Sequence, residues 1–133
     1  MQDLNQQEYS DFIQRNLQRI FPSFMDFFRF EKDVYIIEYP SENKHMTLWV
    51  STQDCEISIG LDKDGECIWH THMSQFGAYE PETELNAAVK FINGIFDGTE
   101  IIVTNSKNEV FVTDTIEESV PDNEFIYKTW REF

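Results

Sequence analysis

The chain has 133 residues, the length of one domain that can bury a sizeable core. Its 25 acidic and 10 basic residues give a formal net charge of −15, which argues against binding to nucleic acid or to an anionic membrane, because both need basic surface. Apolar residues (41%) and aromatic residues (15%) are frequent enough to predict a packed protein rather than a disordered one. The acidic balance suits a basic protein partner, and it is equally explained by a surface charge that only serves solubility.

The N-terminal residues 1–5 contain neither a basic region nor an apolar run, so they do not predict a secretory signal. No stretch approaches the roughly 20 apolar residues of a membrane span. Cys55 and Cys67 are expected roughly 20 Å apart along the strands that carry them, too far for a disulfide, so both are expected to be reduced. These features together predict a cytoplasmic protein outside membranes.

The first half of the chain begins with a predicted helix at residues 5–20. Residues 24–30 favour a short helical turn that leads into an edge strand. Residues 34–39 are β-branched and aromatic and predict a strand. Apolar side chains recur at helical spacing in the first of these segments, namely Tyr9, Ile13, Leu17 and Ile20.

Residues 47–73 predict three strands joined by two tight turns, the segment around which the rest is organised. The second turn, ending in Gly65, favours a three-residue hairpin loop with this glycine in a left-handed bulge. The first turn, around residues 53–54, reads as a two-residue loop. The expected opposite pairs are Trp49 with Ser58, Ser51 with Glu56, Ser58 with His70, Glu56 with His72, Gly60 with Ile68 and Asp62 with Glu66.

Side chains alternate across a strand, so this register predicts two different faces. The core face is expected to hold Leu48, Val50, Ile57, Ile59, Leu61, Cys67, Trp69 and Met73. The other face is mostly polar and is expected to be open to water or to a partner. It holds Thr47, Trp49, Ser51, Glu56, Ser58, His70 and His72.

The second half predicts one helix and three further strands. Pro81 suits the first position of a helix that ends before Gly98. Residues 101–104 and 110–113 predict a hairpin, residues 114–124 an acidic loop and residues 125–130 a last strand. The whole predicts one α+β domain with the order α-ββββ-α-βββ, a mostly antiparallel sheet of about six to seven strands and two helices packed on one face.

Two interpretations of the polar face remain open. Glu56, His70 and His72 form a candidate metal site for a hydrolase, because histidines two apart on a strand share a face, and His45 is a candidate fourth ligand. Alternatively these are ordinary polar side chains on a solvated face. We favour the second interpretation, with no metal, no cofactor and no catalytic residue, since Ser58 opposite a histidine lacks an orienting acid.

Trp49 is the most informative residue of the polar face, because a large aromatic among polar neighbours often marks a contact site. Cover by the following loop, with Phe76 and Tyr79, explains it equally well. The candidate binding face therefore consists of Trp49, Ser51, Glu56, Ser58, His70 and His72, and the acidic loop adds Glu117 and Glu118.

The run Leu48-Trp49-Val50-Ser51 is followed by Trp69-His70-Thr71-His72-Met73, by Phe76-Gly77 and by an amphipathic helix. With its size, acidity and α+β layout, the chain resembles the small acidic immunity proteins of bacterial contact-dependent and polymorphic toxin systems. The resemblance covers most of the chain. It implies a cytoplasmic, non-enzymatic protein that binds and blocks a toxin domain, often a basic nuclease.

Overall fold

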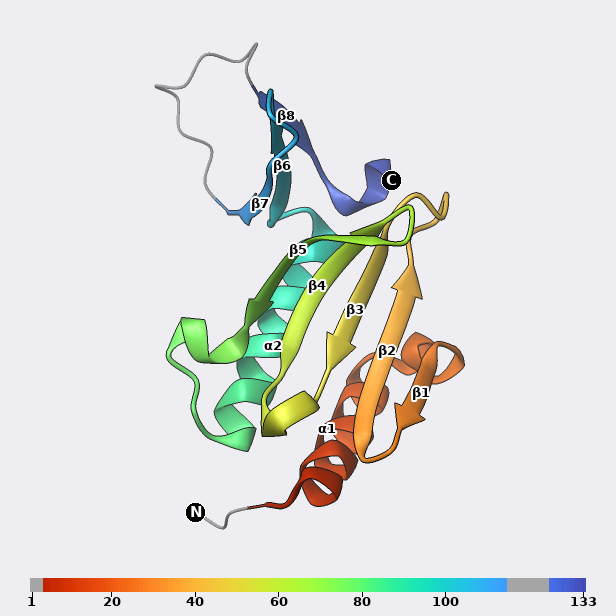
Figure 1. Cartoon of the computed structure of the whole chain (residues 1–133), viewed down its shortest axis with the longest axis vertical. Coiled ribbons are helices and arrows are strands. Elements are labelled where there is room, and N and C mark those ends of the chain that lie inside the picture. Colours follow the sequence, from red (N-terminus) through yellow and green to blue (C-terminus); the bar gives the residue numbers. More distant parts are fainter. Residues whose placement is uncertain (1–3, 115–124) are drawn as a thin grey trace.

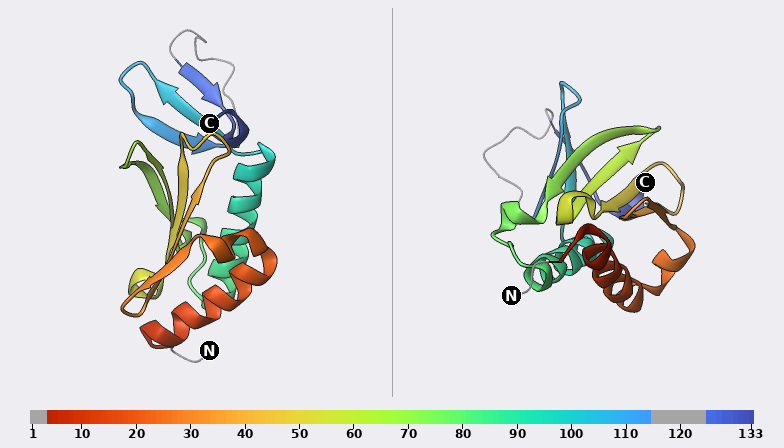
Figure 2. Two further views of the ribbon diagram at one scale, coloured as in Figure 1. Left: turned by 90° about the vertical axis from the view of Figure 1, so that its right-hand side faces the viewer. Right: turned by 60° about the horizontal axis from the view of Figure 1, so that its bottom comes forward.

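The computed structural model describes residues 4–114 and 125–133 and confirms the α+β class. A five-stranded antiparallel sheet has both helices on one face, and a three-stranded antiparallel sheet stands at one end of it (Figure 1). The views of Figure 2 show the helices as a layer beneath the larger sheet. The predicted order is confirmed except that five strands, not four, lie between the two helices, and the eight described strands form two sheets rather than one.

Helix α1 (Gln6–Ile20) begins where its sequence supplies a cap. The Asn5 side chain accepts a hydrogen bond from the Glu8 backbone N–H, and the Glu8 side chain accepts one from the Asn5 N–H. A 3₁₀ turn (Pro22–Asp26) follows and leads into β1 (Phe28–Glu31), which lies at the edge of the larger sheet, as predicted.

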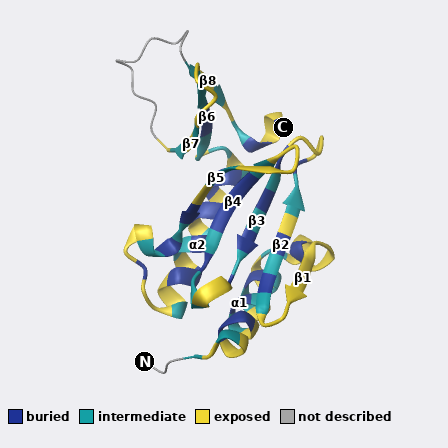
Figure 3. Cartoon of the chain, viewed as in Figure 1, coloured by how far each residue is buried: buried dark blue, intermediate teal, exposed yellow. Residues whose placement is uncertain are grey.

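The larger sheet has the strand order β1-β2-β3-β4-β5, with every neighbouring pair antiparallel. Its helix-covered face is the core, and Leu48, Val50, Ile59 and Leu61 are fully buried there. Figure 3 shows this buried band along the central strands, while β1 is exposed. The remaining strands are β2 (Val34–Pro40), β3 (Thr47–Ser51), β4 (Ser58–Lys63) and β5 (Glu66–His72).

The predicted register between β4 and β5 is wrong by two residues. The turn is a two-residue loop, Asp64-Gly65, because both residues adopt positive φ (54° and 84°), as a type I′ turn requires. A bulge between Leu61 and Asp62 adds a second one-residue shift. A shift of two preserves the alternation of side chains, so the assignment of residues to the two faces survives.

The corrected pairs change what lies opposite each candidate residue. His72 lies opposite Ser58, and His70 lies opposite Gly60. The predicted pairs of Ser58 with His70 and of Glu56 with His72 are therefore wrong. So are the pairs of Gly60 with Ile68 and of Asp62 with Glu66, since Gly60 faces His70 and Asp62 faces Cys67.

Cys67 was predicted on the core face, but it is exposed. It lies opposite Asp62, on the turn side of the bulge, where the pairing differs by one residue from the rest of the hairpin. A one-residue shift moves a side chain to the other face, which explains why the alternation fails here. Both Cys67 and the half-buried Cys55 are free thiols.

The predicted two-residue loop after β3 is also wrong. Residues Gln53–Cys55 form a 3₁₀ turn, and pairing resumes with Ser51 opposite Ser58. Trp49 therefore faces Gly60. The longer loop is held by Gln6 of α1, whose amide donates to the Thr52 carbonyl (2.7 Å) and whose side-chain oxygen accepts from the Cys55 N–H (3.2 Å).

Helix α2 (Pro81–Asp97) starts at the predicted proline and ends at Gly98, whose φ of 85° is the left-handed conformation of a helix C-terminus. The smaller sheet has the order β7-β6-β8 and is joined to the main core by the C-terminal residues Trp130 and Phe133. The last strand is shorter than predicted, because residues Trp130–Glu132 form a 3₁₀ turn. The strands are β6 (Ile101–Asn105), β7 (Val110–Thr113) and β8 (Phe125–Lys128).

Neither α1 nor α2 combines the length and the apolar character that crossing a bilayer requires, and the described parts of the chain contain no other candidate span.

Candidate functional site

The face of the larger sheet that is turned away from the helices carries a hollow of about 390 Å³. Six of its eight lining residues are the binding-face candidates of the polar face, which the strands β3, β4 and β5 and their loops bring together. The complete lining is Trp49, Ser51, Gln53, Asp54, Glu56, Ser58, His70 and His72.

The indole of Trp49 lies flat across the neighbouring strand because residue 60 has no side chain. A Cβ atom at Gly60 would lie 2.1 Å from Cε2 of Trp49, far inside van der Waals contact. On the other side of Gly60, the imidazole of His70 is nearly parallel to the indole, with 6.4 Å between ring centroids and 28° between planes. The glycine thus fixes a broad aromatic surface over the middle of the sheet.

His72 closes the hollow next to this aromatic surface. Its Nδ1 lies 2.6 Å from Oγ of Ser58, directly across the β4–β5 pair, and the imidazole tautomer decides which of the two atoms donates. The His70 and His72 rings meet edge to face at 5.5 Å. A hydroxyl bonded to an imidazole supplies two of the three members of a nucleophilic triad, but no described hydrogen bond joins a carboxylate to His72.

The carboxylate of Glu56 is held at the edge of the hollow by the Ser74 hydroxyl, which donates to it. Beneath the sheet, Glu84 of α2 is 4% exposed and accepts a hydrogen bond from the Ile57 backbone N–H at 3.1 Å. Burial raises the pKa of Glu84, and the nearby charge of Glu56 raises it further. One carboxylate therefore faces the open side of the sheet, and another is buried on the covered side.

The alternative metal site of Glu56, His70 and His72 is not supported by the geometry. Within residues 4–114 and 125–133, no three side chains of His, Cys, Asp or Glu are grouped so that they could hold a metal ion. The hypothesis required Glu56 to lie opposite His72, but Ser58 occupies that position and Glu56 is bonded to Ser74. His45, the suggested fourth ligand, is exposed in the loop before β3.

Sequence reasoning missed Gln53 and Asp54, which line the hollow from the loop after β3. Reading this loop as a two-residue turn concealed them. The positive φ of Asp54 (60°) is the conformational feature that an Asp tolerates better than most residues. The other two candidates, Glu117 and Glu118, lie outside the described residues.

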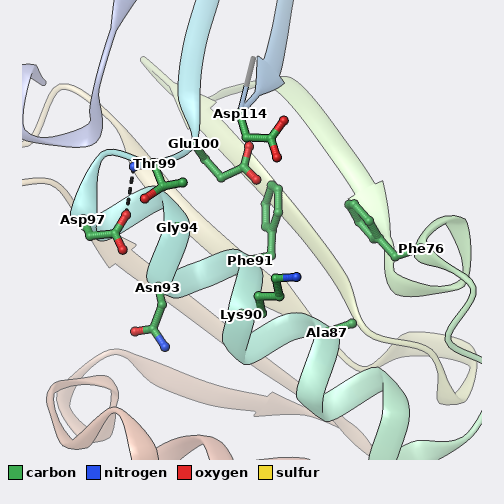
Figure 4. A pocket seen from close by; sticks show the side chains of 10 residues that line it. All are labelled: Phe76, Ala87, Lys90, Phe91, Asn93, Gly94, Asp97, Thr99, Glu100 and Asp114. Carbon is green, nitrogen blue, oxygen red and sulfur yellow. Dashed lines mark hydrogen bonds between the residues drawn. The ribbon is translucent and has the colours of Figure 1, made fainter.

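Sequence reasoning also missed a second pocket, of about 670 Å³, beside α2. Its walls come from α2, from the 3₁₀ turn Met73–Phe76 and from the chain around Glu100 and Asp114 (Figure 4).

Comparison of the chain with protein-family models, with curated proteins and with solved structures found no match.

Proposed function

We propose that the protein is a non-enzymatic, cytoplasmic binding protein, an immunity-type inhibitor that docks a basic toxin domain. The observation that carries this proposal is the open sheet face, where Trp49 and His70 form an aromatic surface next to a hollow lined by hydrogen-bonding side chains. An aromatic anchor in a polar surround is the usual composition of an interface centre. The resemblance to small acidic immunity proteins points to the same kind of partner.

Charge supports a basic partner. The chain has 10 basic and 25 acidic residues, so most acids would remain unpaired even if every base were paired within the protein. Such a surface attracts a basic domain over a distance, raises the association rate and loses this effect as salt screens the charges. The acidic surface thus accounts for the approach of the partner, and the open sheet face for the contact that follows.

The first experiment identifies the partner and tests its charge. The tagged protein is used to capture binding partners from its native cell, and the captured domain is then purified and its binding rates are measured directly. We expect a basic domain whose association rate falls about tenfold or more between low and physiological salt. A neutral partner, or a rate indifferent to salt, would contradict the proposal.

The second experiment locates the contact with matched variants. Trp49→Ala should weaken the affinity about 30-fold, the effect of a typical interface anchor, and His70→Ala should also weaken it. His45→Ala removes an exposed histidine away from the hollow and serves as the control. Unfolding curves confirm that the variants remain folded. Equal affinities for His70→Ala and His45→Ala would place the interface elsewhere.

The inhibitory part of the proposal has its own readout. If the captured domain has a toxic activity such as nucleic-acid cleavage, one equivalent of the protein should abolish it. Binding that leaves the activity of the domain intact would reject the immunity interpretation and retain only a binding protein.

A further inference from the structure

The pocket beside α2 has an aromatic wall and an acidic rim. Phe91, nearly buried on α2, packs between Trp69 and Phe76, with ring centroids 5.6 Å and 5.7 Å away. Phe76 is 55% exposed, so its ring is available to a ligand. Figure 4 shows the Glu100 and Asp114 carboxylates at the tip of the Phe91 ring, while Phe76 lies to the side of this ring.

The rim carries three carboxylates, from Asp97, Glu100 and Asp114, and one base, Lys90, among the ten lining residues. Burial raises the pKa of Glu100, and the negative charges of Asp114 and Asp97 raise it further. The Asp97 carboxylate is fixed by the Thr99 backbone N–H at 2.8 Å. The pocket therefore concentrates negative charge against an apolar wall.

A glycine makes room for the central carboxylate. A Cβ atom at Gly94 would lie 2.8 Å from Cγ of Glu100, so the Glu100 side chain lies directly over the helix backbone. The Glu100 N–H also donates to the Gly94 carbonyl at 2.8 Å, which fixes this residue to the last turn of α2. The carboxylate is thus positioned by the fold at the wall of the pocket.

We propose that this pocket binds an arginine side chain of the protein partner, with the guanidinium donating to Glu100 and lying against the ring of Phe76. A planar guanidinium both bonds carboxylates with two N–H groups and stacks on aromatic rings, whereas an ammonium is a compact, strongly hydrated charge. The inference rests on the proposed function for the existence of a basic partner, and it adds a second contact and the residue type that fills it.

The position of the pocket favours a single partner that reaches both sites. His70 and His72 line the open-face hollow from β5, and Phe76 follows four residues after His72 along the same edge of the sheet. A domain docked on the open face therefore needs to extend only past the β5 edge to place an arginine in the pocket.

The test uses small probes that need no partner. The whole protein, labelled with ¹⁵N, is titrated with N-acetyl-arginine amide, with N-acetyl-citrulline amide as the neutral isostere and with N-acetyl-lysine amide as the other cation. We expect saturable shifts of the amide signals of residues 73–77 and 87–100 with the arginine probe, weaker binding of the lysine probe and no saturable response to citrulline.

Variants then assign the contact to named side chains. Glu100→Gln should weaken binding of the arginine probe about tenfold, because it removes a charged hydrogen-bond acceptor. Phe76→Ala should weaken it about threefold, the effect of an exposed cation–aromatic contact. Glu42→Gln makes the same charge change at an exposed loop position and should leave binding unchanged.

Three results would overturn the inference. These are shifts scattered over the acidic surface, equal binding of the arginine and lysine probes, and equal binding by Glu100→Gln and Glu42→Gln. Failure of the arginine probe while a basic partner is still captured rejects the pocket alone. Saturable arginine binding without any basic partner in the cell supports the pocket and rejects the proposed function.

Discussion

The two faces of the larger sheet are built from alternate residues of the same strands, yet they have opposite properties. On the covered face, Leu48, Val50 and Ile59 are fully buried beneath the helices. One residue away, on the open face, Trp49 and Ser58 are only half-buried and line a hollow with His70. One strand sequence therefore provides stability on one side and a contact surface on the other.

The open face can therefore change without loss of the fold. Apolar burial on the covered side supplies the free energy of folding, while the side chains on the open side contribute hydrogen bonds that water can replace. Substitutions on the covered face should therefore lower stability, and substitutions of their neighbours on the open face should mainly alter the contact surface.

The largest effect is expected from Ile59→Ala on the covered face. It leaves a cavity beneath the sheet and should lower the free energy of unfolding by about 2–5 kcal/mol. Ser58→Ala, its neighbour on the open face, loses one hydrogen bond and should cost about 1 kcal/mol. Urea unfolding measures both variants, and equal losses would mean that the two faces do not differ as described.

An intermediate effect is expected from Gly60→Ala, which places a methyl group where the Trp49 indole lies. The indole must move away from the strand, at a cost of about 1–3 kcal/mol, and the near-UV circular dichroism of the tryptophans should change. In a Trp49→Ala background the same substitution should be neutral or stabilising, because glycine is unfavourable inside a strand. If Gly60→Ala still lowered the stability in the Trp49→Ala background, atoms other than the indole would have to occupy this space.

The two faces were predictable from the sequence because alternation tolerates errors of two residues. The Asp64-Gly65 turn and the bulge at Leu61 each shifted the register by one, and the two shifts together restored the faces. Only Cys67, between the turn and the bulge, was assigned to the wrong face. Helix boundaries were predictable for a similar local reason, because Asn5, Pro81 and Gly98 act on their own neighbours.

Features that depend on distant residues were not predictable. The loop after β3 is fixed by Gln6, which lies 46 and 49 positions earlier in the chain than its two partners. The strands of the smaller sheet were identified, but their separation from the larger sheet is set by tertiary packing. The pocket beside α2 depends on Gly94 leaving space for Glu100, a contact that no periodicity indicates.

The smallest effect is expected from Glu84→Gln, which removes the charge of a carboxylate buried on the covered side. The same change at an exposed acid is the comparison. Burial raises the pKa of Glu84 in the folded protein. At a pH below the usual carboxyl pKa, Glu84 is protonated in both the folded and the unfolded state. It then carries no buried charge and does not lower the free energy of unfolding. As the pH rises, the unfolded state ionises first, and above the raised folded pKa the protein carries a buried charge at full cost.

Glutamine keeps an oxygen that can accept the Ile57 N–H bond and removes this charge. The variant should therefore match the wild type near pH 4 and be more stable at pH 7, by the order of 1 kcal/mol usual for one substitution. Thermal unfolding across this pH range measures the difference, and Glu82→Gln on the exposed side of α2 controls for net charge. A stabilisation by Glu84→Gln that is the same at both pH values, or is matched by Glu82→Gln, would show that burial of the charge is not its cause.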